Sequence, residues 1–301
     1  RSSMKGEVVN VQKGMYHVKS EDGDFFRCLL RGKLLKLERE EKSILAVGDE
    51  VLFERLQKDQ GIITAIEERR SSLVRKGAGK KGRHLEQVVA ANIDQLLVVV
   101  AVKDPPYKKS LIERYITSAR SSGLDVIIVF NKADLGFSER TLEDSKVYGE
   151  LGYTVKFTSV LTGKGIDELA GLLSGKSTVL AGSSGVGKSS LVNAMLNGDS
   201  AKTGEVSQST HKGKHTTTSS SVYYLPGGGK LIDVPGMREF AVSDTEGLDE
   251  AFNDIAELSR GCRFNDCTHT VEPGCAVLKA VEEGTLEKRR LRNYLRIKQY
   301  E

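Results

Sequence analysis

The stretch Gly182-Ser183-Ser184-Gly185-Val186-Gly187-Lys188-Ser189 decides the fold of this 301-residue chain. It fits the pattern G-x-x-x-x-G-K-S/T, in which glycines let backbone N–H groups curl around phosphate oxygens. A short run suited to a buried strand, Thr178-Val179-Leu180, precedes it, and Leu191, Met195 and Leu196 follow at helical spacing. Strand, glycine loop and helix N-terminus in this order predict a nucleotide-binding phosphate loop, and the helix dipole adds to the anion site.

Two residues of this loop have separate predicted roles. Lys188 would reach the β and γ phosphates, and the Ser189 hydroxyl would ligate Mg²⁺. The other residues that we expect to line the phosphates are Gly182, Ser183, Ser184, Gly185, Val186, Gly187 and Ser190.

A guanine-recognition motif, Asn131-Lys132-Ala133-Asp134, follows the apolar strand Val126–Phe130. A carboxylate at Asp134 can accept hydrogen bonds from both guanine N1–H and the exocyclic amine. Adenine offers no such donor pair, so Asp134 favours GTP over ATP. We expect Asn131 to buttress the phosphate loop and the stem of Lys132 to pack over the base.

The order of the motifs is unusual. In an ordinary GTPase the phosphate loop comes first, whereas here the guanine motif precedes it by about fifty residues and Asp233-Val234-Pro235-Gly236 follows it. The same parts in rotated order predict one nucleotide site in a circularly permuted α/β GTPase.

Two weaker motifs complete the predicted site. Asp233 would hold Mg²⁺ through water, and the Gly236 N–H would sense the γ-phosphate. The runs Ser221–Leu225 and Lys230–Asp233, joined by a glycine-rich turn, predict a hairpin of adjacent strands. The stretch Thr158-Ser159-Val160 would supply a backbone N–H to the guanine carbonyl, with Ser159 and Val160 as the candidate residues.

The segment from Thr203 to Ser221 is polar and predicts a switch loop. Thr216 or Thr217 would join the Mg²⁺ shell only while the γ-phosphate is present, and the sequence does not choose between them. Met237 stands where many GTPases place a water-orienting Gln, so we expect slow intrinsic turnover. His215 is the candidate for positioning the water, with a solvated or phosphate-contacting histidine as the alternative.

A second site is predicted near the C-terminus, where Cys262, Cys267, His269 and Cys275 form C-x4-C-x-H-x5-C. Three thiolates and an imidazole suit tetrahedral Zn²⁺. The chain has four cysteines, and the fourth, Cys28, stands alone, which disfavours a disulfide scaffold. Since protein ligands fill all four positions, the zinc is predicted to be structural.

Together these motifs resemble the bacterial RsgA (YjeQ, YloQ) family along nearly the whole chain. The resemblance rests on the phosphate loop, on Gly213-Lys214-His215-Thr216-Thr217-Thr218 and on the cysteine cluster. It implies a GTPase that uses GTP and Mg²⁺ and binds the small ribosomal subunit and its rRNA late in maturation. Lys214 departs from the family, which often has Arg there, and loses a bidentate donor.

Three domains and a linker are expected. Residues 4–68 alternate apolar and polar residues between glycines, which predicts an OB-fold barrel that contacts RNA. Residues 69–84 form a basic linker, 85–240 the permuted GTPase domain, and 241–301 an α-helical zinc-binding domain.

The C-terminal segment Lys288–Lys298 carries four arginines and an apolar face at helical spacing. It predicts an amphipathic helix that covers the zinc-binding fragment. A packed helix can still present arginines to RNA, so both interpretations stay open.

Composition sets the remaining limits. Against 41 acidic side chains there are 45 basic ones, so any RNA-binding surface must be local. The longest apolar run, Leu96–Val102, is far shorter than the roughly 20 residues that span a bilayer. We expect a cytoplasmic protein, monomeric when free, with no membrane or DNA partner. The alternatives are a GTP-dependent RNA scaffold with negligible turnover and, less favoured, a signalling or traffic GTPase.

Overall fold

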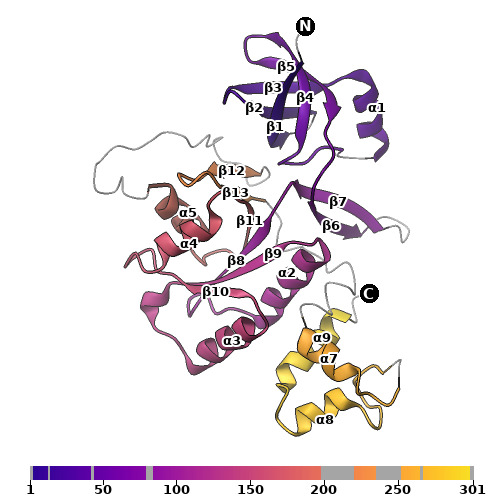
Figure 1. The fold of residues 1–301 in the computed structure, drawn as a ribbon, viewed down its shortest axis with the longest axis vertical. Helices are drawn as coiled ribbons and strands as arrows, with labels where there is room; N and C mark the ends of the chain where they lie inside the picture. Colours follow the sequence, from indigo (N-terminus) through magenta and orange to yellow (C-terminus); the bar gives the residue numbers. More distant parts are fainter. Residues whose placement is uncertain are drawn as a thin grey trace.

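The computed structural model describes residues 3–12, 14–41, 44–78, 84–197, 220–234, 252–264 and 267–298. A barrel, a central sheet with helices on its faces, and a group of C-terminal helices follow one another along the molecule (Figure 1). No helix within these ranges is long and apolar enough to cross a membrane.

The N-terminal domain is a closed five-stranded barrel in the order β1-β2-β3-β5-β4, as expected for an OB fold. Alternate residues of its strands point inward, so that Val8, Val18 and Phe53 are fully buried. The elements are β1 (Ser3–Gln12), β2 (Met15–Ser20), β3 (Phe25–Leu30), α1 (Gly32–Glu41), β4 (Glu50–Gln57) and β5 (Gln60–Ile66).

The segment that we expected to be a linker contains a strand instead. β6 (Ser72–Ala78) pairs antiparallel with β7 (His84–Ala91) as a separate two-stranded sheet. Leu73 and Ala90 are fully buried at its base. The chain between the barrel and the GTPase domain therefore runs out and back as a ribbon before it enters the central sheet.

The central sheet has six strands in the order β10-β9-β8-β11-β13-β12, of which only β12 runs antiparallel to its neighbour. β8 (Gln95–Ala101) and β11 (Ser177–Ala181) are buried along their whole length, as expected for a parallel sheet covered on both faces. The other strands are β9 (Asp125–Asn131), β10 (Thr154–Phe157), β12 (Ser221–Tyr224) and β13 (Lys230–Asp233).

The strand order agrees with the predicted permutation. The strand that leads into the phosphate loop, β11, lies at the centre of the sheet. Its neighbours are β8, which is the first strand of this sheet along the chain, and β13, which is the last. The helices of this domain are α2 (Lys109–Ser121), the 3₁₀ turn η1 (Ala133–Leu135), α3 (Glu139–Glu150), α4 (Ile166–Leu173) and α5 (Lys188–Asn197).

The C-terminal part consists of α7 (Asn253–Ser259), α8 (Ala276–Glu282) and α9 (Lys288–Lys298). Helix α9 has the predicted range, and ion pairs fix it both to helices α2 and α3 of the GTPase domain and to α7. Arg290, only 2% exposed, donates to Glu113 at 2.9 Å and to Asp254 at 2.8 Å. Arg289 donates to Asp144 at 3.1 Å. These two arginines are therefore engaged within the molecule, whereas Arg292 is exposed.

Candidate nucleotide site and metal centre

The described motif residues meet at the carboxyl edge of the central sheet. The guanine motif begins at the end of β9, the phosphate loop follows β11, and Asp233 ends β13. Because parallel strands present their carboxyl ends at one edge, three stretches distant in sequence are brought together there.

The phosphate loop turns sharply out of β11 into α5. Gly182 has φ +145°, and a Cβ atom on it would come within 2.3 Å of the Val99 carbonyl oxygen of the neighbouring strand. Only glycine fits such an approach. The Lys188 ammonium lies inside the loop, where it donates to the carbonyl oxygens of Gly182 and Ser183 at 2.8 Å each. Ser189 and Ser190 are exposed in the first turn of α5, where a helix N-terminus favours anions.

Asn131 joins the guanine motif to the phosphate loop. Its side-chain amide donates to the Val186 carbonyl at 2.9 Å, and its oxygen accepts from the Thr158 hydroxyl at 2.9 Å. Gly187 makes this contact possible, because a Cβ atom there would lie 2.4 Å from the Asn131 amide nitrogen. The predicted buttress is thus observed. The sequence did not predict that the hydroxyl of Thr158, a fully buried residue, would hold the Asn131 side chain.

Asp134 and Lys132 are each held in place by a hydrogen bond within the protein. The Ser159 hydroxyl donates to the Asp134 carboxylate at 2.5 Å. Lys132 adopts φ +59°, and its ammonium donates to the Asp104 carbonyl oxygen at 2.6 Å. The sequence did not reveal this role of Asp104, although the pair Pro105-Pro106 shortly after the strand β8 was a sign of a turn.

Asp233 lies close enough to the phosphate loop for its ionisation to be affected by Lys188. Burial raises the pKa of the Asp233 carboxyl, and the Lys188 ammonium partly opposes this shift. A carboxylate that is partly desolvated and faces a cation suits the second shell of a divalent metal.

The described residues do not decide every predicted role at this site. His215, Thr216, Thr217 and Gly236 lie outside the described residues. The Ser159 N–H already donates to the Lys164 carbonyl at 2.9 Å, and the Val160 side chain is exposed. Which amide would meet the guanine carbonyl therefore remains a prediction.

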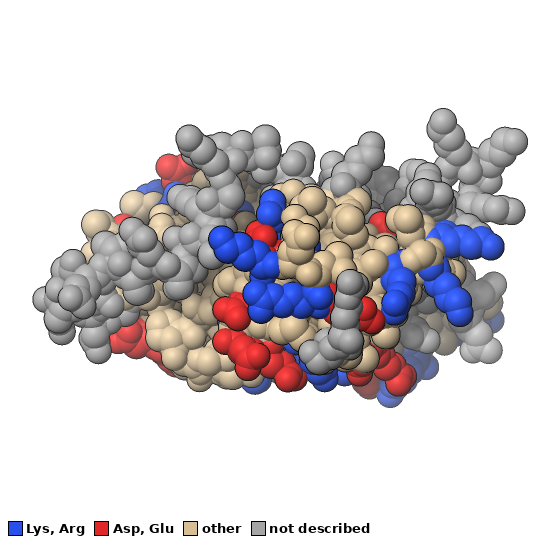
Figure 2. Space-filling view, turned by 90° about the horizontal axis from the view of Figure 1, so that it is seen from above, with Lys and Arg blue, Asp and Glu red and all other residues tan. Residues whose placement is uncertain are grey.

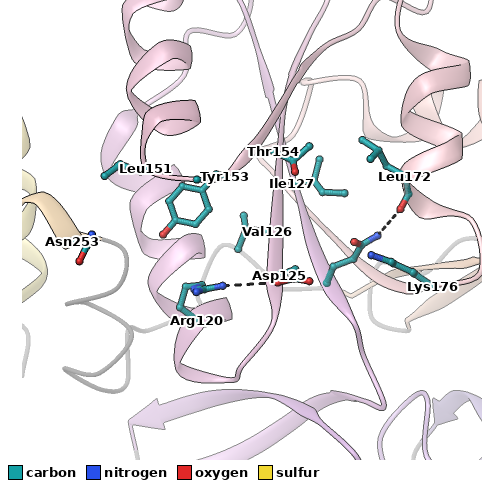
Figure 3. Close-up of a pocket in the computed structure, with 12 residues that line it drawn as sticks. Arg120, Asp125, Val126, Ile127, Leu151, Tyr153, Thr154, Leu172, Lys176 and Asn253 are labelled. Atoms are coloured by element: carbon teal, nitrogen blue, oxygen red, sulfur yellow. Dashed lines mark hydrogen bonds and ion pairs between the residues drawn. The ribbon is translucent and has the colours of Figure 1, made fainter.

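A cavity of about 500 Å³ lies at the other edge of the sheet (Figure 3). Asp125 and Thr154, at the starts of β9 and β10, are among its lining residues, and an Arg120–Asp125 ion pair of 3.9 Å crosses its rim. It contains none of the motif residues. We therefore do not assign the nucleotide to this cavity.

The four predicted zinc ligands converge within the C-terminal part. Their ligand atoms all lie within 4.8 Å of one another. The two sulfurs of Cys262 and Cys275 are 3.8 Å apart, and His269 Nδ1 lies 3.6 and 3.4 Å from them. Two thiolates about 2.3 Å from a tetrahedral zinc ion are separated by about 3.8 Å, so the cluster has the dimensions of such a centre.

The start of α8 favours the ionised form of one of these thiols. Burial alone would raise the pKa of Cys262, but the backbone N–H groups of Val277 and Ala276 hold it below its usual value. A thiolate is the form that binds zinc. Of the four cysteines, Cys28 lies apart in the barrel core, where burial raises its pKa to about 12.

Comparisons with known proteins agree with this geometry. The RsgA N-terminal domain profile matches residues 5–63, and the RsgA GTPase profile matches residues 66–243. A protein of Chlorobaculum tepidum named small ribosomal subunit biogenesis GTPase RsgA is 39% identical, covering 98% of this chain and 97% of its own length. A Bacteroides fragilis protein of the same name is 38% identical, covering 97% and 95%.

Solved structures give the same result. The crystal structure of YjeQ from Thermotoga maritima superposes with a TM-score of 0.71 at 31% identity, covering 98% of this chain and 97% of that one. YloQ, a circularly permuted GTPase, superposes with a TM-score of 0.67 at 28% identity, covering 100% and 97%. From its barrel, its permuted nucleotide site and these matches, the chain belongs to the RsgA family of GTPases.

Proposed function

We propose that this protein hydrolyses GTP while bound to the small ribosomal subunit, and that it acts late in maturation of that subunit. The observation that carries the proposal is the hydrogen bond from Asn131 to Val186, which ties guanine recognition to the phosphate loop. The names of the relatives, small ribosomal subunit biogenesis GTPases, support the choice of partner.

In this mechanism the chain's own residues position the nucleotide. Asp134 and Lys132 would hold the base, Lys188 would pair with the β and γ phosphates, and Ser189 and Asp233 would hold Mg²⁺. When bound, Mg²⁺ would neutralise negative charge that develops on the phosphates during hydrolysis. Gly236 and either Thr216 or Thr217 would contact the γ-phosphate side of the site.

Turnover is proposed to be slow alone and faster on the subunit. Met237 replaces a water-orienting side chain, which leaves His215 as the group to position water when the small subunit is bound. The binding free energy of the partner would then supply the positioning that the free protein lacks.

The RNA-binding surface is proposed to be local. Viewed from the barrel end, basic side chains lie in separate groups with acidic ones among them (Figure 2). The barrel, the basic segment at 69–84 and the exposed Arg292 are the candidate contacts with rRNA phosphates. We propose a cytoplasmic monomer that binds neither DNA nor membrane, and we retain the domain limits 4–68, 85–240 and 241–301.

We also propose that Cys262, Cys267, His269 and Cys275 hold one structural zinc ion. The donor set and its spacing support this assignment. Metal analysis of the purified protein should give one equivalent of zinc, and Cys267→Ser should lose it.

The deciding experiment measures GTP turnover by the protein alone, with small subunits and with large subunits. We expect strong stimulation by small subunits only, abolished in Lys188→Ala. Lys176→Ala removes an exposed lysine that lines the cavity at the opposite edge, and it should behave like the parent protein. Equal slow turnover in every mixture, despite tight GTP binding, would instead favour the alternative of a GTP-dependent RNA-binding scaffold.

A further inference from the structure

The hairpin β12–β13 connects two parts of the proposed phosphate site. Its first strand follows the predicted switch segment, and its second ends at Asp233. In the ladder Ser221 lies opposite Asp233, so both connections emerge at the same end of the hairpin. A ligand that repositions both connections would therefore act on the hairpin as one unit.

The barrel contacts this hairpin through polar groups along the length of the hairpin. Asn10 Nδ2 donates to the Ser220 carbonyl at 3.1 Å, beside the phosphate-site end. Near the turn, Glu7 forms an ion pair with Lys230, and their side chains are 22% and 17% exposed. The Lys19 ammonium lies 3.6 Å from the centre of the Tyr224 ring. We call these three contacts, on strands β1 and β2, the latch.

A second attachment of the barrel is of a different kind. The Ala91 N–H donates to the Val47 carbonyl at 2.8 Å, and the Asn92 amide donates to the Gly48 carbonyl at 2.8 Å. A Cβ atom on Gly48 would come within 2.0 Å of the Ala91 carbonyl oxygen, so the backbones are in close contact. Val47 and Ala91 are buried. We call this attachment the pivot.

The pivot and the latch differ in how easily they can be opened. The pivot is buried and consists of backbone and amide hydrogen bonds, which are costly to break without replacement. The latch consists of partly exposed charged and polar groups, which water can solvate when they separate. A small polar contact between domains is compatible with relative motion.

We propose that the β12–β13 hairpin reports the state of the bound nucleotide to the barrel by changing the latch, with the barrel turning about the pivot. The inference rests on the proposed GTP site, because the γ-phosphate is what would move the two ends of the hairpin. It gives the N-terminal barrel a nucleotide-dependent pose through a contact that involves neither the C-terminal helices nor the zinc ligands.

Hydrogen exchange of the full chain with GDP and with a non-hydrolysable GTP analogue, both with Mg²⁺, tests the idea. We expect protection of residues 182–189 by both nucleotides. Exchange in β1 should differ severalfold between them, while exchange in β3, which makes none of the latch contacts, should not. Protection at 182–189 with identical exchange in β1 would overturn the inference and leave the proposed function standing. Absence of protection at 182–189 would overturn both.

Charge variants test the latch itself. Lys230→Glu and Glu7→Lys should each remove the difference between nucleotides in β1, and the double exchange should restore it. Lys5→Glu is the matched control, because Lys5 lies on the same strand and forms an exposed ion pair of 3.0 Å with Glu50 of the same barrel. A difference that persists in Lys230→Glu, or that is lost equally in Lys5→Glu, would contradict the proposal. Restoration in the double variant excludes simple misfolding.

Discussion

At the scale of single residues, Asp134 shows how a neighbour prepares a binding group. The Ser159 hydroxyl donates to its carboxylate at 2.5 Å and fixes its orientation before any base arrives. In Asp134→Ala the proposed hydrogen bonds to guanine are lost, each worth about 1.5–3 kcal/mol for a charged acceptor. We expect GTP affinity to fall by at least about 100-fold, since two such bonds are worth about 3 kcal/mol or more and 1.4 kcal/mol is about tenfold.

A titration with labelled GTP, in competition with ATP, measures this effect. Asp167→Ala is the control, because Asp167 is an exposed carboxylate in the first turn of α4. A loss of GTP affinity no larger than that of the control would contradict the assigned role of Asp134.

Asp144 gives a prediction about stability and pH. Burial alone would raise its pKa, but hydrogen bonds from Tyr107 and Lys109 hold the pKa below its usual value of 3.8. The ionised carboxylate therefore stabilises the fold fully above about pH 4, and the stabilisation is lost as the pH falls through the lowered pKa. Asp144→Asn removes one of the two ion pairs of the buried Lys109, which keeps its contact with Glu287 at 2.9 Å, and should cost about 1–3 kcal/mol at pH 7.

Urea unfolding followed by the fluorescence of the tyrosines can measure that difference at pH 7 and at decreasing pH. The gap between parent and variant should narrow below about pH 4. A gap that stays constant, or that widens in acid, would show that the ion pair does not account for the effect.

The residues that could be identified from the sequence belong to short motifs, in which fixed residue types stand at fixed spacing. The phosphate loop, Asn131 and Asp134 belong to such patterns. The Asp104 carbonyl escaped prediction because a backbone oxygen has no signature of its own. Arg290 carries a charge typical of a surface, and only the fold brings Glu113 and Asp254 to its guanidinium.

At the scale of elements, α9 is held to the GTPase domain by ion pairs as well as by its apolar face. Because Arg290 is 2% exposed, Arg290→Met leaves Glu113 buried without this partner and should destabilise the protein by about 3–5 kcal/mol. The exposed Arg292 is the matched control, and Arg292→Met should change stability by about 0.5 kcal/mol or less. Thermal unfolding of the two variants compares them, and equal melting temperatures would contradict this account of α9.

The strands and helices of the central sheet were largely predictable because strong apolar periodicity marks them. The β6–β7 ribbon was not, because a two-stranded sheet buries few side chains. Leu73 and Ala90 at its base are buried, whereas the basic, glycine-containing sequence around its turn resembles a linker. In the C-terminal part, the cysteine and histidine spacing predicted the zinc cluster, and the apolar face of Lys288–Lys298 predicted α9.

Removal of zinc should act on the same C-terminal elements. A chelator is expected to increase hydrogen exchange in α7 and α8, because the proposed zinc ligands lie between these two helices. Nucleotide binding should persist, since Asn131 and the phosphate loop lie in another domain. Exchange data recorded with and without chelator, alongside a GTP titration, check both statements. Unchanged exchange in these helices would argue against structural zinc.

At the scale of the whole molecule, a chain with only four excess basic side chains must bind RNA through local groups. Affinity for small subunits should fall steeply as salt rises. Replacing Lys80, Lys81 and Arg83, which lie outside the described residues, with Ser should reduce the slope of log K against log salt by about 0.7–0.9 for each phosphate that is no longer neutralised. Binding measured across a salt series tests this, and an unchanged slope would place the RNA-binding groups elsewhere.

The order of strands in the central sheet has a consequence for synthesis of the chain. β8 and β9 can pair as soon as they emerge, but the other edge of β8 is covered only by β11. From residue 101 to residue 177, at about 5–20 residues per second, that wait lasts about 4–15 s. During it a strand whose seven residues are all buried in the finished fold presents an open edge. The permutation thus makes the nascent domain a candidate client of chaperones that shield unpaired strands.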